Sequence, residues 1–198
     1  MEITTLVSWL VLIFAVFYII RIFNTLVALK NRFQNSFSQI EVQLKRRYDL
    51  IPNLVETAKA YMSHERETLE AVIAARNGAL SGLKEAASDP TNGQSLKKLA
   101  SGEGLLQSAL GKLNIAVEAY PELKANENMM QLSEELTSTE NRVAFARQAF
   151  NDTVMEYNNF RQSFPNNFFA PTFGHKKDAS LLEFEDSVEI KQAPKVSF

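Results

Sequence analysis

The pattern of apolar and polar positions opens with eighteen uncharged residues in a row, from Ile3 to Ile20. As a helix with a rise of about 1.5 Å per residue, this run spans roughly 27 Å, which is close to the hydrocarbon thickness of a bilayer. Trp9 and Tyr18 lie toward its ends, where amphipathic rings favour the interface. A secretory signal peptide or a buried core helix are the alternatives. A signal peptide has a basic start, whereas Glu2 is the only charged residue before this run. We therefore expect a retained transmembrane anchor over residues 1–23.

The residues beyond the anchor have helical periodicity, and residues 24–165 are expected to form a bundle. The first stripe of apolar positions steps by three, four or seven residues: Phe33, Phe37, Ile40, Leu44, Ile51, Leu54, Ala58, Tyr61, Leu69, Val72 and Ile73. Only Arg47 interrupts the rhythm. Pro52 lies within the stripe, and proline kinks or ends a helix. Because the stripe keeps its phase, the sequence favours one long helix kinked near Tyr48 over two helices that reverse direction.

Turn signals divide the rest of the chain. Residues 82–93 contain Asp-Pro and Asn-Gly and are predicted to be a loop. A second helix is expected from Ser95 to the proline at 121, followed by a connector over 122–127. A third helix of about 36 residues is expected from Met129 to Phe164, and Pro165 stops it. The fold class is therefore all-α: an N-terminal transmembrane helix, an antiparallel bundle of long helices, and an extended tail over 166–198 that packs on or near the bundle.

Charge predicts how the chain is oriented and excludes one class of partner. Residues 21–50, which follow the apolar run, contain six basic and two acidic residues. No lysine or arginine precedes the run. The positive-inside rule therefore places the N-terminus outside and the bundle in the cytoplasm, in a single-pass protein of the inner (cytoplasmic) membrane. The basic residues are interpreted as a stop-transfer flank, with contact to anionic headgroups as the alternative. The net charge of −2 gives no reason to expect a nucleic-acid partner. The absence of cysteine means that no disulfide is needed.

The search for catalytic or metal-binding motifs gives nothing. A di-iron bundle site needs Glu three residues before an inward-facing His, but Tyr61 precedes His64 at that spacing and Thr172 precedes His175. Phosphate-binding loops, zinc-protease motifs and nucleophile elbows are absent from the sequence. We therefore expect no enzyme activity, no cofactor, no metal and no small-molecule substrate.

Polar residues are dense within two of the expected helices, and repeated asparagine is unusual there because it is a poor helix former. One hypothesis is a buried or interface network in which Arg46 or Arg47 pairs with Glu140 or Glu156. The alternative, a solvated helix face, fits any single residue equally well. The candidate network residues are Arg46, Arg47, Asp49, Asn53, Glu56, Glu140, Asn141, Arg147, Tyr157 and Asn158.

These same residues lie in stretches that resemble the LemA family. The stretches are SQIEVQLKRRYDLIPNLVETAKAYMSHERETLEAVIAAR at 38–76, the segment 118–170 that ends in YNNFRQSFPNNFFA, and the ending APKVSF at 193–198. The resemblance covers nearly the whole chain and is weakest around 82–104. It implies a single-pass protein with its N-terminus outside and a cytoplasmic antiparallel bundle. It implies no cofactor and no catalytic residues.

The expected function therefore rests on architecture. The first hypothesis is a non-enzymatic scaffold that self-associates under the bilayer through exposed aromatic residues, for which Phe33, Phe37, Phe160, Phe164, Phe168 and Phe169 are the candidates. The expected partners are the lipid bilayer and further copies of the chain. The alternative is an adaptor or regulator of a membrane protease or envelope-stress system, a membrane protein partner that would bind the tail through Pro194, Val196 and Phe198. In either case the anchor is expected to continue directly into the first bundle helix and to hold the body at a fixed angle.

Overall fold

A computed structural model describes residues 2–184 of the chain, and every regular element in that range is a helix. The elements are α1 (Ile3–Lys59), α2 (Arg66–Ser88), α3 (Gly93–Val117), α4 (Pro121–Lys124), α5 (Glu127–Gln162) and α6 (Asn166–Phe169). The predicted all-α class, with a long apolar N-terminal helix and a helical bundle, is confirmed. The tail residues Pro194, Val196 and Phe198 lie outside the described range.

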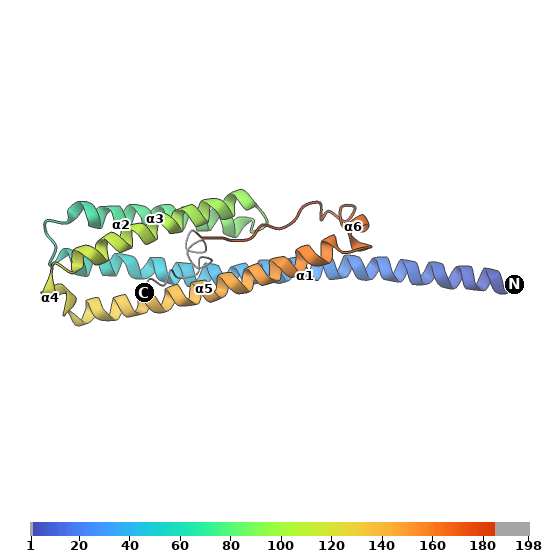
Figure 1. Cartoon of the computed structure of the whole chain (residues 1–198), viewed down its shortest axis with the longest axis horizontal. Coiled ribbons are helices and arrows are strands. Elements are labelled where there is room, and N and C mark those ends of the chain that lie inside the picture. The colour runs from blue at the N-terminus through green and yellow to red at the C-terminus, as the bar shows by residue number, and fades with distance from the viewer. Residues whose placement is uncertain (1, 185–198) are drawn as a thin grey trace, which may run out of the picture.

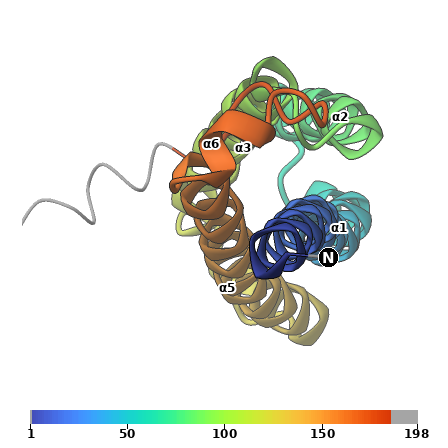
Figure 2. The same ribbon diagram turned by 90° about the vertical axis from the view of Figure 1, so that its right-hand side faces the viewer.

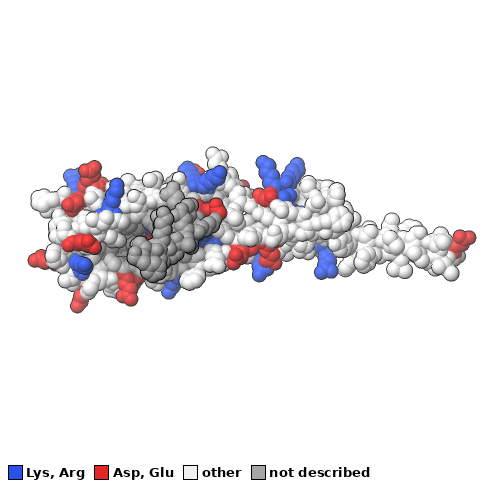
Figure 3. Space-filling model, in the orientation of Figure 1, with Lys and Arg blue, Asp and Glu red and all other residues white. Residues whose placement is uncertain are grey.

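The first helix has two different environments along its length. Residues 3–18 are exposed along the whole run, and the first buried position of α1 is Ile22. The apolar part projects alone beyond the bundle (Figure 1), and in the space-filling view it is free of charge except at its tip (Figure 3). It is long and apolar enough to cross a membrane. From Ile22 onward the same helix is packed into the bundle, so the anchor-like segment and the core share one continuous helix of 57 residues.

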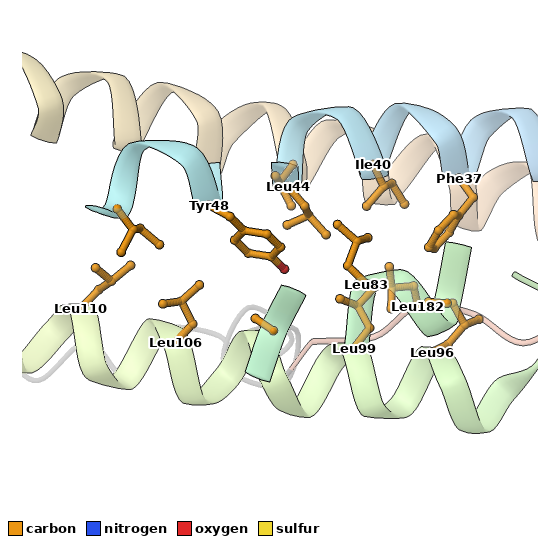
Figure 4. Packing of buried hydrophobic residues seen from close by; sticks show 14 of the residues in the cluster. Phe37, Ile40, Leu44, Tyr48, Leu83, Leu96, Leu99, Leu106, Leu110 and Leu182 are labelled. Atoms are coloured by element: carbon orange, nitrogen blue, oxygen red, sulfur yellow. The ribbon is translucent and has the colours of Figure 1, made fainter. Parts of the chain in front are cut away.

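The bundle consists of two antiparallel helix pairs. α1 packs along α5 and α2 packs along α3, and the two pairs meet where α1 lies beside α2 (Figures 1 and 2). Between the pairs, leucine, isoleucine and aromatic side chains from α1, α2 and α3 point toward one another, and Leu182 of the tail lies among them (Figure 4). The tail therefore contributes to the same core as the helices.

The prediction that the first helix continues through Pro52 is confirmed, whereas the prediction that the chain does not reverse direction is wrong. α1 continues through Pro52 without interruption. Proline leaves the carbonyl four residues earlier without its helical donor, and that carbonyl, on Tyr48, accepts a hydrogen bond of 2.9 Å from Arg76 Nε of α2. The helix then ends at Lys59, and the chain reverses direction between residues 60 and 65 around the buried Met62. The apolar stripe hid this turn, because both helices face the same core.

Glycine misled the prediction for the second helical pair. Gly82 lies inside α2, and a Cβ there would be 3.1 Å from the Leu99 Cα of α3. On α3, a Cβ at Gly102 would be 3.0 Å from the Ala79 Cα of α2. These glycines therefore allow two backbones to approach closely rather than forming a loop. The actual turn is short, residues 89–92. The Asn92 side chain caps α3 by accepting hydrogen bonds from the backbone N–H groups of Gln94 and Ser95.

The remaining boundaries shift by a few residues. α3 ends at Val117, and Pro121 begins the short α4 instead of closing α3, because proline is tolerated at the first position of a helix. The long α5 has the expected 36 residues but starts two residues earlier, where the Asn126 side chain accepts a hydrogen bond from Met129 N. Of the aromatic residues predicted to be exposed, Phe33 and Phe37 are instead core residues, at 1% and 2% exposure.

Candidate functional site

A cluster of charged residues lies at the centre of the bundle. Arg47 on α1 donates from Nη1 to Glu103 Oε2 of α3 and from Nη2 to Glu140 Oε1 of α5, both at 2.8 Å. The Tyr48 hydroxyl donates to the other oxygen of Glu103 at 2.5 Å. The Arg47 and Glu103 side chains are only 5% and 3% exposed, whereas the Glu140 side chain is 45% exposed. This charged cluster therefore joins three helices through one guanidinium group.

Burial dominates the electrostatics of Glu103. Removal from water raises the pKa of its carboxyl above the usual range, and the Arg47 charge and the Tyr48 hydrogen bond offset only part of that effect. A buried ion pair of this kind contributes little net stability, but losing one partner leaves the other buried and uncompensated. The arrangement is suited to fixing the register of the three helices. Within the described residues, Arg47 Nε and Gln43 Oε1 are buried without a hydrogen-bond partner.

A second polar region lies along α5, where two asparagines bind the backbone of the tail. Asn151 donates from Nδ2 to the Leu182 carbonyl at 3.1 Å and accepts from Leu182 N–H at 2.9 Å. Asn158 makes the same pair of bonds to Ala179, both at 2.9 Å. Each amide therefore satisfies one donor and one acceptor, as a neighbouring β-strand would. We call Asn151 and Asn158 the amide clamp.

Other contacts hold the tail residues that precede Ala179. Arg161 and Gln162 donate to the Asp178 carboxylate, and these bonds lower the pKa of Asp178 below its usual value, with Gln162 the largest cause. Tyr157 Oη shares a hydrogen bond of 2.9 Å with His175 Nδ1. Burial is the main reason that the pKa of His175 is lowered, and the charges of Lys30 and Arg161 lower it further.

The structure brings only some of the predicted network residues together. Arg47 contacts Glu140, which is one of the four pairings named from the sequence, while Glu156 instead pairs with Arg32 at 2.8 Å. Tyr157 and Asn158 contact the tail, as does Arg147, whose guanidinium carbon lies 4.6 Å from the centroid of the Phe184 ring. The remaining candidates, all exposed, are Arg46, Asp49, Asn53, Glu56 and Asn141.

Sequence reasoning missed the residue that completes the charged cluster. Glu103 is not among the network candidates named from the sequence. Its spacing was informative, since it lies four residues after Leu99 and three before Leu106, on the buried stripe of α3. Arg47 interrupts the stripe of α1 in the same way. A charge within an apolar stripe is the signal that could have paired the two.

Neither polar region resembles a reactive centre. In the charged cluster the carboxylates bind the Arg47 Nη atoms and the Tyr48 hydroxyl, and in the amide clamp the side-chain amides bind backbone groups. No group of three or more His, Cys, Asp or Glu side chains that could hold a metal ion occurs between residues 2 and 184. The hydrogen bonds of the two regions therefore hold helices and an extended segment in place.

Comparison with known proteins identifies the group to which the chain is related. It is 27% identical over 170 residues to magnetosome proteins MamQ 1 and MamQ 2 of Paramagnetospirillum magneticum, which covers 78% of this chain and 62% of each relative. It is 26% identical over 166 residues to protein LemA of Metamycoplasma hominis, which covers 83% of this chain and 71% of that protein. The chain thus spans 62% of the length of these magnetosome relatives. The model of the LemA family matches residues 36–198, which include the charged cluster and the amide clamp, and the chain therefore belongs to the LemA family.

Proposed function

We propose that this protein is a non-enzymatic scaffold, anchored in the cytoplasmic membrane by residues 3–20, whose bundles self-associate at the cytoplasmic face. The observation that carries the proposal is the continuity of α1, which serves first as an apolar projection and then as the helix at the centre of the bundle. A bundle built on its own anchor keeps one orientation relative to the bilayer. Anchored copies are also confined to two dimensions, so weak lateral contacts are sufficient for association.

The outer surface of the bundle supports contacts between copies. Ile115 on α3 and Phe145 on α5 are each 73% exposed, and Leu105 on α3 is 67% exposed. Exposed apolar side chains lose unfavourable contact with water when they are covered by another copy. The proposal also fits the polar interior, whose groups are used in holding the fold. The relatives named as magnetosome proteins carry the name of a cellular structure and not of a reaction, which is compatible with a scaffold.

The native mass of the full chain in detergent tests self-association. We expect a mass above that of one chain and its bound detergent, and Phe145→Glu is expected to lower it. Gln148→Glu, at another exposed position of α5, is the matched control and should leave the mass unchanged. A monomer at high protein concentration would contradict the scaffold proposal.

Membrane orientation can be tested separately, because the chain has no cysteine. Glu2→Cys and Ile115→Cys each introduce a single thiol, one before the apolar segment and one on the exposed face of α3. The basic flank after the anchor supports an outside N-terminus. A maleimide that cannot cross membranes is expected to label Glu2→Cys in intact cells and Ile115→Cys only after lysis. The reverse pattern would overturn the orientation.

The second candidate function is an adaptor for a membrane protease or stress-response protein that recognises the tail. It is supported by the amide clamp, which fixes the position of residues 179 and 182 and so presents the chain beyond them from a defined place on the bundle. Deletion of 193–198 separates the two functions. Crosslinked partners are expected to disappear while self-association survives if the adaptor function is correct, and partners that persist would exclude it.

A further inference from the structure

The end of the bundle nearest the apolar projection is formed by an uncharged segment. No charged residue occurs between Gln162 and His175, although the helix before and the tail after this segment are both charged. It contains the turn from α5 into α6, α6 itself, and the first residues of the tail. Figure 1 shows α6 at the end of the bundle from which α1 emerges, whereas the turn between α2 and α3 lies farther from the apolar projection.

Two aromatic side chains of this segment face away from the protein. Phe164 is 80% exposed and Phe168 is 69% exposed, and their rings meet edge to face with centroids 6.0 Å apart. We call this pair the aromatic foot. The next two phenylalanines behave differently, since Phe169 and Phe173 stack with centroids 6.5 Å apart and are half-buried against the core. Phe164 and Phe168 therefore differ from the neighbouring phenylalanines in that they are exposed and contact each other instead of the core.

The aromatic foot is held rigidly in its outward position. Asn166, which lies between the two phenylalanines in the sequence, is only 6% exposed, and its side chain donates a hydrogen bond of 2.8 Å to the Phe160 carbonyl of α5. Ala170, which follows α6, is fully buried. These contacts fix the turn to the end of α5 and so hold in place the backbone that carries the two exposed rings.

The same segment touches α1 close to the end of its apolar run. Phe173 packs edge to face on Phe23 with centroids 5.2 Å apart. Phe23 lies only three residues after Ile20, the last residue of the uncharged run. When residues 3–20 cross a bilayer, the segment that carries the aromatic foot is consequently held at the membrane surface. Two exposed lysines, Lys176 and Lys177, follow it in the chain.

We propose that Phe164 and Phe168 insert into the interfacial layer of the bilayer that α1 crosses, and so form a second membrane contact beside the anchor. Aromatic and apolar side chains on a peripheral element bury about 5–10 Å into the boundary between headgroups and acyl chains. Basic side chains near an anionic surface add attraction for its headgroups. The proposal rests on the anchoring part of the proposed function. A bilayer is the expected partner of the aromatic foot because the segment that carries the foot contacts α1 directly beside its apolar run.

Single-cysteine labelling of the full chain tests this contact. Phe168→Cys, Ile13→Cys in the apolar run and Ile115→Cys on α3 are each labelled with a nitrobenzoxadiazole fluorophore, and the protein is placed in vesicles of phosphatidylcholine and phosphatidylglycerol. A nitroxide on the upper acyl chain is expected to quench the labels at 168 and 13 several-fold more than the label at 115. Aqueous iodide is expected to quench mainly the label at 115.

Each other outcome overturns the proposal for a distinguishable reason. Quenching by lipid at 13 but not at 168, with iodide reaching 168 freely, leaves the anchor intact and removes the second contact. Protection of 168 from both quenchers indicates that a second copy of the chain covers the aromatic foot. Absence of lipid quenching at 13 shows that the anchoring on which the proposal rests has itself failed.

A second set of variants tests whether the rings themselves hold the segment at the surface. The label is placed at the exposed Thr172 as Thr172→Cys, with and without the double change Phe164→Ser and Phe168→Ser. Iodide access at 172 is expected to rise several-fold in the double variant. Asn167→Ser, at an exposed position of the same short helix, is the matched control and should leave access unchanged. Equal access in all three proteins would show that the rings make no membrane contact.

Discussion

The charged cluster and the amide clamp both include polar side chains of α5, but they hold different parts of the molecule together. In the charged cluster, Arg47 and Glu103 are almost fully removed from water and bind each other, so that helices are joined to helices. In the amide clamp, neutral side chains bind the backbone of an extended segment that has no strand beside it. Charge is used where geometry must be unique, and amides are used where a donor and an acceptor must be satisfied together.

This difference has an energetic consequence. Losing one member of a buried charge pair leaves an ion without compensation, whereas losing an amide leaves two backbone groups that water can still reach if the tail moves away. Damage to the charged cluster should therefore affect the whole bundle. Damage to the amide clamp should release the tail and leave the helices folded.

The largest expected effect tests whether the charged cluster is central to the bundle. Arg47→Ala leaves the buried Glu103 without its cation, and we expect a loss of about 3–5 kcal/mol in the free energy of unfolding. Arg46→Ala, at the adjacent exposed position, is expected to change it by less than about 0.5 kcal/mol. Urea unfolding followed by circular dichroism measures both. Similar small losses in the two variants would place Arg47 on a solvated face in solution.

A smaller and more local effect is expected at the amide clamp. Asn158→Ala removes two hydrogen bonds to Ala179, which together contribute about 1–3 kcal/mol to tail docking. Hydrogen exchange at the Ala179 amide should become faster, while exchange in α2 and α3 is unchanged. The neighbouring Asn159 has an exposed side chain, so Asn159→Ala is the control. Faster exchange throughout the bundle would mean that the two polar regions are not energetically separate.

The smallest effect concerns the pH dependence of the tail. Because the pKa of His175 is lowered in the folded protein, the released tail binds a proton more readily below about pH 6.5. Docking is therefore expected to weaken slightly as the pH falls from about 7 to about 5. Exchange at Ala179 would report this loss, and His175→Gln should flatten it. The exposed His64 on the turn after α1 provides His64→Gln as control. A pH effect that survives in His175→Gln belongs to another group.

The sequence was sufficient for the features that depend on local pattern. The apolar run, the helical class and the length of α5 follow from periodicity and composition, and Arg47 was noticeable as a charge in an apolar stripe. The resemblance to the LemA family was also visible in the sequence and is confirmed. The contact between Arg47 and Glu140 was one of several pairings that the sequence left open.

The features that were missed depend on three-dimensional partners. The reversal after Lys59 was hidden because Leu69 and Val72 face the same core as the stripe of α1. Gly82 is typical of a loop until the backbone of Leu99 is placed beside it. The asparagines of α5 were unusual in the sequence, but their role requires an extended segment from 21 to 31 residues further along the chain. No periodicity in a helix can reveal the backbone groups that it will bind.

Because α1 is one continuous helix, a change in the tilt of its apolar part also moves the part that lies in the bundle. Its buried part, from Ile22 to Lys59, has a length of about 57 Å at the rise of a regular helix. Helices adjust their tilt when bilayer thickness changes, and a rotation of about 10° at the membrane displaces the far end of such an arm by about 10 Å. Because the core is built on this arm, α4 and the ends of the neighbouring helices move with it. In the proposed scaffold, the thickness of the membrane would in this way set the distance between the outer ends of adjacent bundles.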